Sequence, residues 1–397
     1  MPLVAVLYGP EAVGAWGAWL ALAGIIGVVA CCRYDTAIAL PASDREAIHV
    51  ALLAVLLAVL VCGLTAILVP IILLAGIPGP WHTQGVALGW VPLGALVLAW
   101  VMVATQWLAR VHAVSSLAAA KIWCGAVTAG LHLVLGLLGA GALGLIAGDV
   151  GGRCAGLWGR TRQAWRDHAA EIAHTQPSDL WNAARRHRVH ALWMTPTTLI
   201  DGIGQQVPLL CILSFYGDAV GGQFALAQRM MALPAALLGQ SIAQFFLPMM
   251  ARAHRHADGS AIRLFLGLSG VLAGCGVAVL TAMSLVTADR ISFVLGWEWR
   301  DMMVFVTPLA VLTAAALVAS TVSQTAIVLG GQRWYAMWVT LRLLAVATGM
   351  WLGDQWDGVH GAVWGMCVAG CVSYGVLWGV MVWGLANSSA GQAKPCT

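Results

Sequence analysis

Long apolar runs, separated by short polar loops, divide this chain almost from end to end. A helix that crosses a bilayer needs about 20 apolar residues, and on that criterion the sequence predicts eleven spans. Only 9% of the 397 residues are charged, whereas a soluble chain carries about 25%. So few charges cannot cover a soluble surface, and the sequence therefore predicts an all-α polytopic membrane protein. The predicted spans are 11–32, 49–75, 85–108, 122–138, 139–157, 191–214, 223–247, 264–287, 303–328, 335–353 and 362–384.

The basic residues set the predicted orientation, because Lys and Arg gather on cytoplasmic loops. Fifteen of the twenty fall on one side of the membrane, and only Arg290 and Arg300 fall on the other. The first side is expected to be cytoplasmic, which places the C-terminus inside and Met1 outside. The fifteen residues are Arg33, Arg45, Arg110, Lys121, Arg160, Arg162, Arg166, Arg185, Arg186, Arg188, Arg252, Arg255, Arg263, Arg333 and Lys394.

Two short stretches look like copies of one outer turn: VLYGPEAVG at 6–14 and SFYGDAVGG at 214–222. Each is followed by a predicted span and then by a Leu-Pro pair, at 40–41 and 247–248 respectively. The register is kept, since 32 residues separate the turn glycine from the proline in the first copy and 31 in the second. Both copies cross the membrane in the same direction, as in transporters with parallel repeats.

The repeat predicts two helical lobes, with five spans in the first and six in the second. The span at 191–214 has no counterpart before Leu7, so the first lobe is expected to lack one helix. Between the lobes lies a basic stretch whose helical pattern predicts an amphipathic linker at the headgroups. The predicted divisions are 1–157 for the N-terminal lobe, 158–190 for the linker, 191–386 for the C-terminal lobe and 387–397 for a cytoplasmic tail.

Three patches of the sequence carry a family resemblance. They are RYDTAIALPASDREA at 33–47, YGxxxxGxFALAxR from Tyr216 and LPxxLxGQxIxQxFLP from Leu233. These patches resemble the polysaccharide-export flippases, the O-antigen and exopolysaccharide translocases of the multidrug/oligosaccharidyl-lipid/polysaccharide exporter superfamily. The resemblance extends over nearly the whole chain. It implies two lobes around a central cavity, with six helices in each, so the chain departs from the family pattern by one helix.

The resemblance also implies a function: translocation of undecaprenyl-diphosphate-linked oligosaccharide from the inner to the outer leaflet by alternating access. The sugar and diphosphate would cross through the cavity while the polyprenyl tail stays in lipid. The expected location is the bacterial cytoplasmic (inner) membrane. The expected partners are the lipid-linked oligosaccharide, membrane lipids, the polysaccharide polymerase and the chain-length machinery. No nucleic acid, cofactor or metal is expected.

Arg229 and Arg342 are the first candidates for substrate contact, because ionisable residues inside spans are costly and mark functional sites. Each lies several residues into a predicted span. A guanidinium can hold phosphate with a bidentate fork. The alternatives are that these side chains reach out to lipid headgroups or form structural pairs.

Asp201, Gln205, Gln240 and Gln244 complete the candidate set. Gln240 and Gln244 are four residues apart and share a helix face, which suits recognition of sugar hydroxyls. Gln205 lies in the unusually polar stretch around Asp201. Asp201 is a candidate for proton coupling, with hydrogen bonding between helices as the simpler alternative.

Three other functional classes remain open at this point. A cation-coupled multidrug exporter of the same superfamily would favour a compact acidic cavity. A membrane-embedded polysaccharide polymerase or glycosyltransferase usually carries its catalytic residues on a large outer loop, which this sequence lacks. The sequence contains no nucleophile elbow and no HExxH spacing, so no catalytic residue is predicted and the protein is not expected to be an enzyme. A scaffold subunit is the third alternative.

Overall fold

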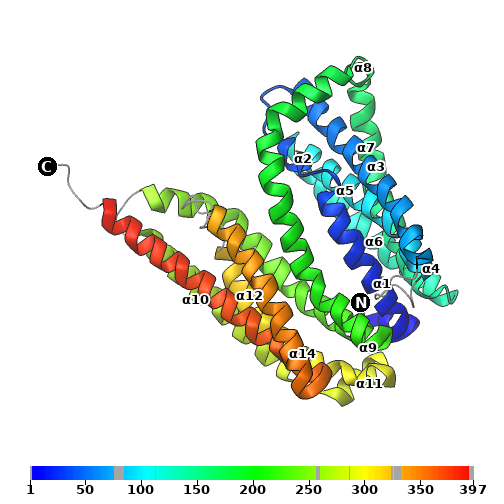
Figure 1. Ribbon diagram of the computed structural model, residues 1–397, viewed down its shortest axis with the longest axis vertical. Helices are drawn as coiled ribbons and strands as arrows, with labels where there is room; N and C mark the ends of the chain where they lie inside the picture. Colours follow the sequence, from blue (N-terminus) through cyan, green and yellow to red (C-terminus); the bar gives the residue numbers. More distant parts are fainter. Residues whose placement is uncertain are drawn as a thin grey trace. The chain divides into compact units, whose positions relative to one another are not determined.

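The computed structural model describes residues 2–75, 85–111, 113–255, 260–285, 287–322, 325 and 332–392. Every described element of secondary structure is a helix, and helices make up 93% of the described residues (Figure 1). This confirms the predicted all-α architecture. By contacts the chain divides into two compact units, the N-terminal unit Pro2–Gly222 and the C-terminal unit Gln223–Thr397. The boundary between these units, at 222/223, falls after the predicted linker at 158–190. The lobe boundaries that the repeat suggests stay a prediction.

The described residues of the N-terminal unit form eight helices and the first part of a ninth. α1, α3, α5, α6 and α7 are its long helices, and α2, α4 and α8 are short connectors. Trp16 and Trp19 of α1 are almost fully buried and form part of its core. The bounds are α1 Pro2–Ala30, α2 Tyr34–Ala37, α3 Asp44–Leu74, α4 Gly85–Gly89, α5 Val91–Arg110, α6 Val114–Leu137, α7 Gly141–Asp167, α8 Ala169–Ala173 and α9 Pro177–Arg255.

α6 and α7 form a close hairpin. The sequence GLLGAGALG predicts a tight break near residue 139, and Gly139 and Gly141 there have φ angles of +68° and +55°. Along α7, glycines four residues apart face α6, and a Cβ at Gly152 would collide with the side chain of Thr128. Small residues at this spacing let two membrane helices approach closely. The glycines therefore allow the two helices of the hairpin to approach closely.

The two predicted outer turns are real backbone breaks of the same kind. Gly9 interrupts α1 with φ 69° and ψ 168°, and Gly217 interrupts α9 with φ 82° and ψ 179°. Only glycine adopts such a positive φ without strain. The local repeat that the sequence predicts is thus present in the backbone at both positions.

Within the N-terminal unit, these two turns also lie against each other. A Cβ built on Gly14 would collide with the carbonyl oxygen of Asp218, and a Cβ on Gly222 would collide with that of Pro10. Gly14 and Gly222 are the last residues of the two copies, while Pro10 and Asp218 follow the two turn glycines. The contact is therefore reciprocal, as expected for two copies related by a local two-fold axis.

The C-terminal unit continues α9 and adds, among its described residues, three long helices (α10, α12 and α14) and two short ones (α11 and η1). α14 contains a break at Asp357 and Gly358, after which the chain reverses. Beside this break a Cβ on Gly353 would collide with the carbonyl oxygen of Gly361, so the two halves of α14 pack closely. The bounds are α10 Ser260–Ser284, α11 Ala288–Leu295, the 3₁₀ helix η1 Trp297–Met302, α12 Met303–Val322 and α14 Gln332–Gln392.

Eight helical segments among the described residues are long and apolar enough to cross a membrane. Two of these, 191–232 and 334–387, each continue through a break, at Gly217 and at Asp357–Gly358 respectively. Each therefore covers parts of two predicted spans. The span predicted at 139–157 lies in α7, which is not among the eight. The remaining segments are Val4–Ala30, Asp44–Leu74, Ala87–Arg110, Ser115–Leu137, Ser260–Met283 and Trp297–Ala319.

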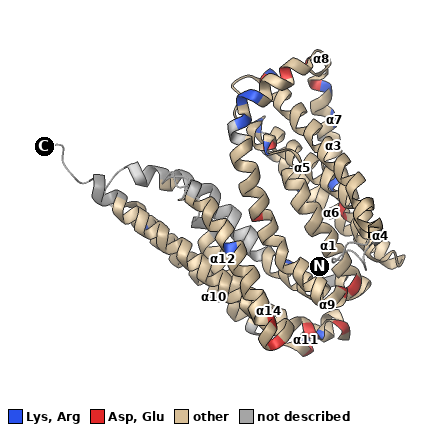
Figure 2. Cartoon of the chain, in the orientation of Figure 1, with Lys and Arg blue, Asp and Glu red and all other residues tan. Residues whose placement is uncertain are grey.

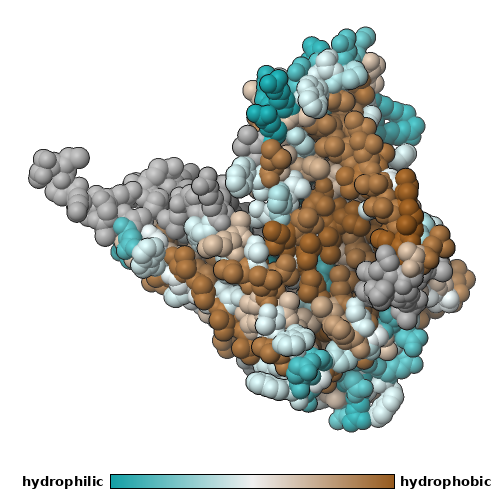
Figure 3. All heavy atoms as spheres, in the orientation of Figure 1, coloured by the Kyte–Doolittle hydropathy of each residue, from teal (hydrophilic) through white to brown (hydrophobic). Residues whose placement is uncertain are grey.

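The distribution of hydrophobic residues on the surface of the N-terminal unit is typical of a membrane protein. Hydrophobic residues cover its visible middle between hydrophilic ends (Figure 3). Lys and Arg gather mostly at the end that carries α2 and α8 (Figure 2). This is the end expected to be cytoplasmic. The Leu-Pro repeat is less regular, since the pair at 40–41 follows α2 whereas the pair at 247–248 falls inside α9.

Candidate functional site

Arg342 is held in α14 by two aromatic side chains. Its Nη1 donates a hydrogen bond of 2.8 Å to the hydroxyl of Tyr374. The guanidinium carbon lies 5.2 Å from the ring centroid of Trp338 and 5.7 Å from that of Tyr374. Trp338 is one turn earlier on the same half of α14, whereas Tyr374 comes from the returning half. Cation–π attraction and the hydrogen bond together fix the position of this charge.

A cavity of about 470 Å³ in the C-terminal unit has Tyr374 in its wall. Trp378, one turn further along α14, also lines it and donates its Nε1–H to the Oγ of Ser269 at 3.1 Å. The Tyr374 hydroxyl accepts from Arg342 and still has its own hydrogen to donate. The complete lining is Leu266, Ser269, Gly270, Ala273, Ala315, Val318, Ala319, Cys371, Tyr374, Gly375 and Trp378.

This arrangement gives an otherwise apolar cavity a small set of polar groups at one wall. Arg342 supplies a positive charge behind the Tyr374 hydroxyl, and Ser269 supplies a second hydroxyl. Such groups can bind an anionic or hydroxyl-rich ligand, because each can form hydrogen bonds where water is scarce. Arg342 is thus connected to this cavity through Tyr374.

Arg229 lies in the part of α9 that belongs to the C-terminal unit, and its side chain is half-buried. The start of this segment is anchored by Gln223, whose Nε2 donates to the carbonyl oxygen of Glu298 at 2.9 Å. Residues Gln223 to Ala227 are buried. Arg229 therefore directly follows a buried segment of α9.

Asp201 and Gln205 form a pair within α9. The Nε2 of Gln205 donates a hydrogen bond of 2.9 Å to the Oδ2 of Asp201, one helical turn away. Both lie in the N-terminal unit. The structure therefore brings these two predicted residues together. The side chains of the remaining two, Gln240 and Gln244, lie outside the described residues.

A buried polar cluster in the N-terminal unit joins α1, α6 and α7. The indole Nε1 of Trp16 donates a hydrogen bond of 2.7 Å to the Oδ2 of Asp149. Trp16 also packs edge-on against His132, with ring centroids 5.5 Å apart. The Nε2 of His132 lies 3.0 Å from the carbonyl oxygen of Leu145, and Tyr8 donates to the carbonyl oxygen of His132 at 2.7 Å. Four polar side chains thus find partners inside the helices, two of them at backbone carbonyls.

This cluster corrects one prediction from the sequence. The i,i+4 spacing of Asp149 and Arg153 suggests that they pair, but no ion pair joins them in the part of the chain that the structure describes. The prediction is wrong because Asp149 faces Trp16 of α1. The sequence does show that Asp149 is an acid within an apolar stretch, which marks it as a residue of interest. Its partner, 133 positions away, is not recoverable from spacing.

The RYDTAIALP patch is clamped at the end of the N-terminal unit that carries α2. Arg110, the last residue of α5, donates to the carbonyl oxygens of Ile38 and Pro41 at 3.1 and 2.9 Å. The same guanidinium contacts the Oδ1 of Asp44 at 3.0 and 3.2 Å. One side chain therefore holds both the loop and the first turn of α3.

The start of α9 also contacts the RYDTAIALP patch and the first turn of α3. The Tyr34 hydroxyl donates to the carbonyl oxygen of Ala184 at 3.0 Å. Burial raises the pKa of this hydroxyl above its ordinary value, so it stays protonated and can donate. Arg186 and His187 contact Glu46 of α3 at 2.8 and 3.4 Å. The conspicuous sequence of this loop thus has a structural role that the described contacts account for.

Solved structures with the same fold are known transporters. The inward-facing conformation of a multidrug resistance MATE family transporter of the MOP superfamily is 16% identical, with a TM-score of 0.76 over 99% of this chain and 94% of that chain. The outward-facing conformation of such a transporter is 14% identical, with a TM-score of 0.58 over 99% and 92%. A MOP superfamily transporter from Pyrococcus furiosus, whose reverse polarity of binding pocket is described as suggesting a different function, is 16% identical, with a TM-score of 0.61 over 99% and 92%. The chain therefore has the two-lobe MATE-like fold.

The sequence comparisons identify the family. The search of curated proteins found no match. The family described as polysaccharide biosynthesis protein matches residues 87–304, which is more than half of the chain. The matched region includes α5, all of α9 and the buried Asp149. The chain belongs to the polysaccharide biosynthesis protein family.

Proposed function

We propose that this protein is a flippase that moves an undecaprenyl-diphosphate-linked oligosaccharide from the inner to the outer leaflet. The observation that carries the proposal is the contact of Arg342 with Tyr374 at the wall of a cavity. A charge held by aromatic side chains inside an apolar helix is costly unless it serves a function. Membership of the polysaccharide biosynthesis protein family points to a saccharide as the cargo.

In this proposal Arg342 attracts the diphosphate, because a guanidinium binds phosphate oxygens with two parallel hydrogen bonds. Tyr374 and Ser269 donate to sugar hydroxyls or to phosphate oxygens at the cavity wall. Arg229, Gln205, Gln240 and Gln244 are proposed as further contacts for the polar headgroup. The polyprenyl tail stays in lipid while the two lobes alternate between access to the two leaflets.

Asp201 is proposed as a coupling group for this cycle. It accepts a hydrogen bond from Gln205 within its own helix. Protonation of the carboxyl would convert Asp201 from an acceptor only into a donor as well. Such a change can bias the helix between two arrangements, which is what coupling to a proton gradient requires.

The proposed setting is the bacterial cytoplasmic membrane, with the C-terminus in the cytoplasm. The unequal distribution of basic residues supports this orientation. The product would be delivered to the outer leaflet, where a polysaccharide polymerase and its chain-length machinery are the proposed partners.

The test is complementation of a strain that lacks its own polysaccharide flippase. The full-length gene should restore surface polysaccharide, and Arg342→Gln should reduce it at least about tenfold because a charged hydrogen-bond donor is lost. Arg263→Gln is the matched control, since Arg263 is an exposed residue near the start of α10. Equal protein levels in the membrane must be shown for all variants. Failure of the wild-type gene to restore any polysaccharide in several such strains would refute the proposal.

A cation-coupled multidrug exporter is the second candidate. The similar solved structures include multidrug resistance transporters, and Asp149 is a buried acid within the N-terminal unit. If this is the function, expression should raise resistance to cationic drugs, and Asp149→Asn should abolish that resistance. Restored polysaccharide without altered drug resistance would instead support the flippase.

A further inference from the structure

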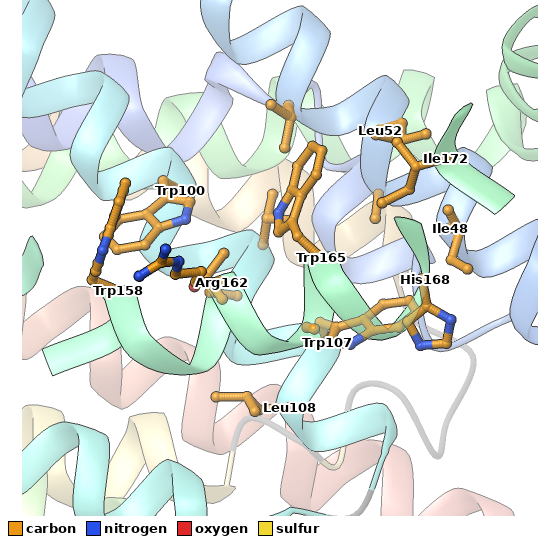
Figure 4. A pocket seen from close by; sticks show the side chains of 16 residues that line it. Ile48, Leu52, Trp100, Trp107, Leu108, Trp158, Arg162, Trp165, His168 and Ile172 are labelled. Atoms are coloured by element: carbon orange, nitrogen blue, oxygen red, sulfur yellow. The ribbon is translucent and has the colours of Figure 1, made fainter. Parts of the chain in front are cut away.

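A second cavity, of about 370 Å³, lies within the N-terminal unit, among α3, α5, α7 and α8 (Figure 4). Its walls are built from the last turns of α5 and α7 and from the start of α3. Arg110 ends α5 and Arg166 is in the last turn of α7. The cavity is therefore at the basic end of this unit, where the headgroups of the cytoplasmic leaflet are expected.

The lining of this cavity is almost wholly apolar and contains four tryptophans. Trp100 and Trp107 come from α5, and Trp158 and Trp165 come from α7. The side chains of Trp158 and Trp165 are 64% and 43% exposed, so they stand at its outer side. The apolar walls of this cavity offer water few hydrogen-bond partners. Hydrocarbon is the filling that suits it, and tryptophan is the residue that suits the boundary between hydrocarbon and headgroups.

Among the described lining side chains, two can carry a positive charge, Arg162 and His168. His168 is already engaged, because its Nδ1 lies 3.5 Å from the Oε2 of Glu171 and its ring packs edge-on against Trp107 at 5.3 Å. Arg162 takes part in none of the ion pairs found between described residues, and it is exposed. One cation thus stands beside an apolar, tryptophan-lined cavity.

We propose that this cavity binds one anionic phospholipid of the cytoplasmic leaflet. An acyl chain occupies the space between the tryptophans, and Arg162 binds the phosphate. Basic pockets between membrane helices on the cytoplasmic side bind anionic lipid headgroups in this way. The site is distinct from the cavity lined by Tyr374 in the C-terminal unit. The proposal does not depend on the transport activity proposed above.

The test compares two lipids with identical acyl chains, phosphatidylglycerol and phosphatidylcholine, added to the purified full-length protein in detergent. Thermal unfolding should show a larger rise in Tm with phosphatidylglycerol. Arg162→Gln should weaken the apparent affinity for phosphatidylglycerol about fivefold, the effect of one basic residue near a membrane surface. Arg166→Gln is the matched control, because Arg166 is one turn further along α7, exposed, and absent from the cavity lining. It should bind phosphatidylglycerol like the wild type.

A second measurement tests the place of the acyl chain. Phosphatidylglycerol with brominated acyl chains should quench part of the tryptophan fluorescence, and Ala164→Phe, which fills the cavity, should remove that part. Equal effects of the two headgroups, or equal losses in Arg162→Gln and Arg166→Gln, would overturn the proposal. It would also be overturned if undecaprenyl phosphate raised Tm at lower concentration than phosphatidylglycerol and did so only with Arg162 present. The cavity would then be assigned to the carrier lipid.

Discussion

Gly14 and Gly222 meet through a reciprocal contact: a Cβ on Gly14 would lie 3.1 Å from the amide nitrogen of Gly222, and one on Gly222 would lie 2.8 Å from that of Gly14. They occupy the same position in the two copies of the turn motif. Neither accepts a larger residue, since backbone atoms of the other copy fill the space. The repeat in the sequence is therefore also a physical contact between its two copies.

The first prediction is that Gly222→Ala destabilises the protein. In a helix, Gly→Ala normally stabilises by about 0.5–1 kcal/mol, but here the new methyl group would collide with the backbone of Pro10. Overpacking of this kind costs about 1–3 kcal/mol, so Tm in detergent should fall. Gly202→Ala is the control on the same helix, because nothing lies within 4 Å of its Cβ position. Equal Tm values for the two variants would contradict the close contact.

The second prediction concerns Trp16. Trp16→Phe leaves the buried carboxylate of Asp149 without its indole donor, which should cost about 1–3 kcal/mol of stability. Trp19→Phe is a closely matched control. Trp19 is equally buried on the same helix, but its Nε1 has no hydrogen-bond partner among the described residues. Thermal denaturation should therefore show a clearly larger loss for Trp16→Phe, and similar losses would argue that packing alone matters.

The third prediction concerns the clamp formed by Arg110. Arg110→Gln removes the hydrogen bonds to Ile38, Pro41 and Asp44, so the loop between α2 and α3 should open more often. Hydrogen exchange followed by mass spectrometry should show faster exchange of the amides in 38–46. Lys121→Gln, at an exposed residue of α6, should leave these rates unchanged. Unaltered exchange in Arg110→Gln would mean that the contacts from α9 suffice.

The fourth prediction separates the hydroxyl of Tyr374 from its ring. Tyr374→Phe keeps the aromatic face against Arg342 but removes the hydrogen bond, and transport in the complementation assay should fall about fivefold to tenfold. Arg342→Lys should be similarly impaired because a lysine lacks the bidentate fork. Trp383→Phe, at an exposed position of the same helix, should behave as wild type. Full activity of Tyr374→Phe would show that the hydroxyl has no part in the proposed site.

Several features could be predicted because their signals are local. Apolar runs predicted most of the helices, and the two YG turns predicted the breaks at Gly9 and Gly217. Arg342 was identifiable because a guanidinium within an apolar run is rare whatever surrounds it. Its partner Tyr374 was not identifiable, since it lies 32 positions away on the returning half of α14 and no local spacing connects the two halves.

The sequence by itself determined the membrane class, the helical content, the positions of the turns and the few charges that the helices carry. The tertiary structure decided which of these charges meet which partners, as with Asp149 and Trp16, and where the cavities lie. The physical reason is that these helices are apolar on all sides. In lipid such a helix has no hydrophobic face that marks its packing partner. Only close packing between particular small and aromatic residues selects the neighbours, and that selection involves residues more than a hundred positions apart.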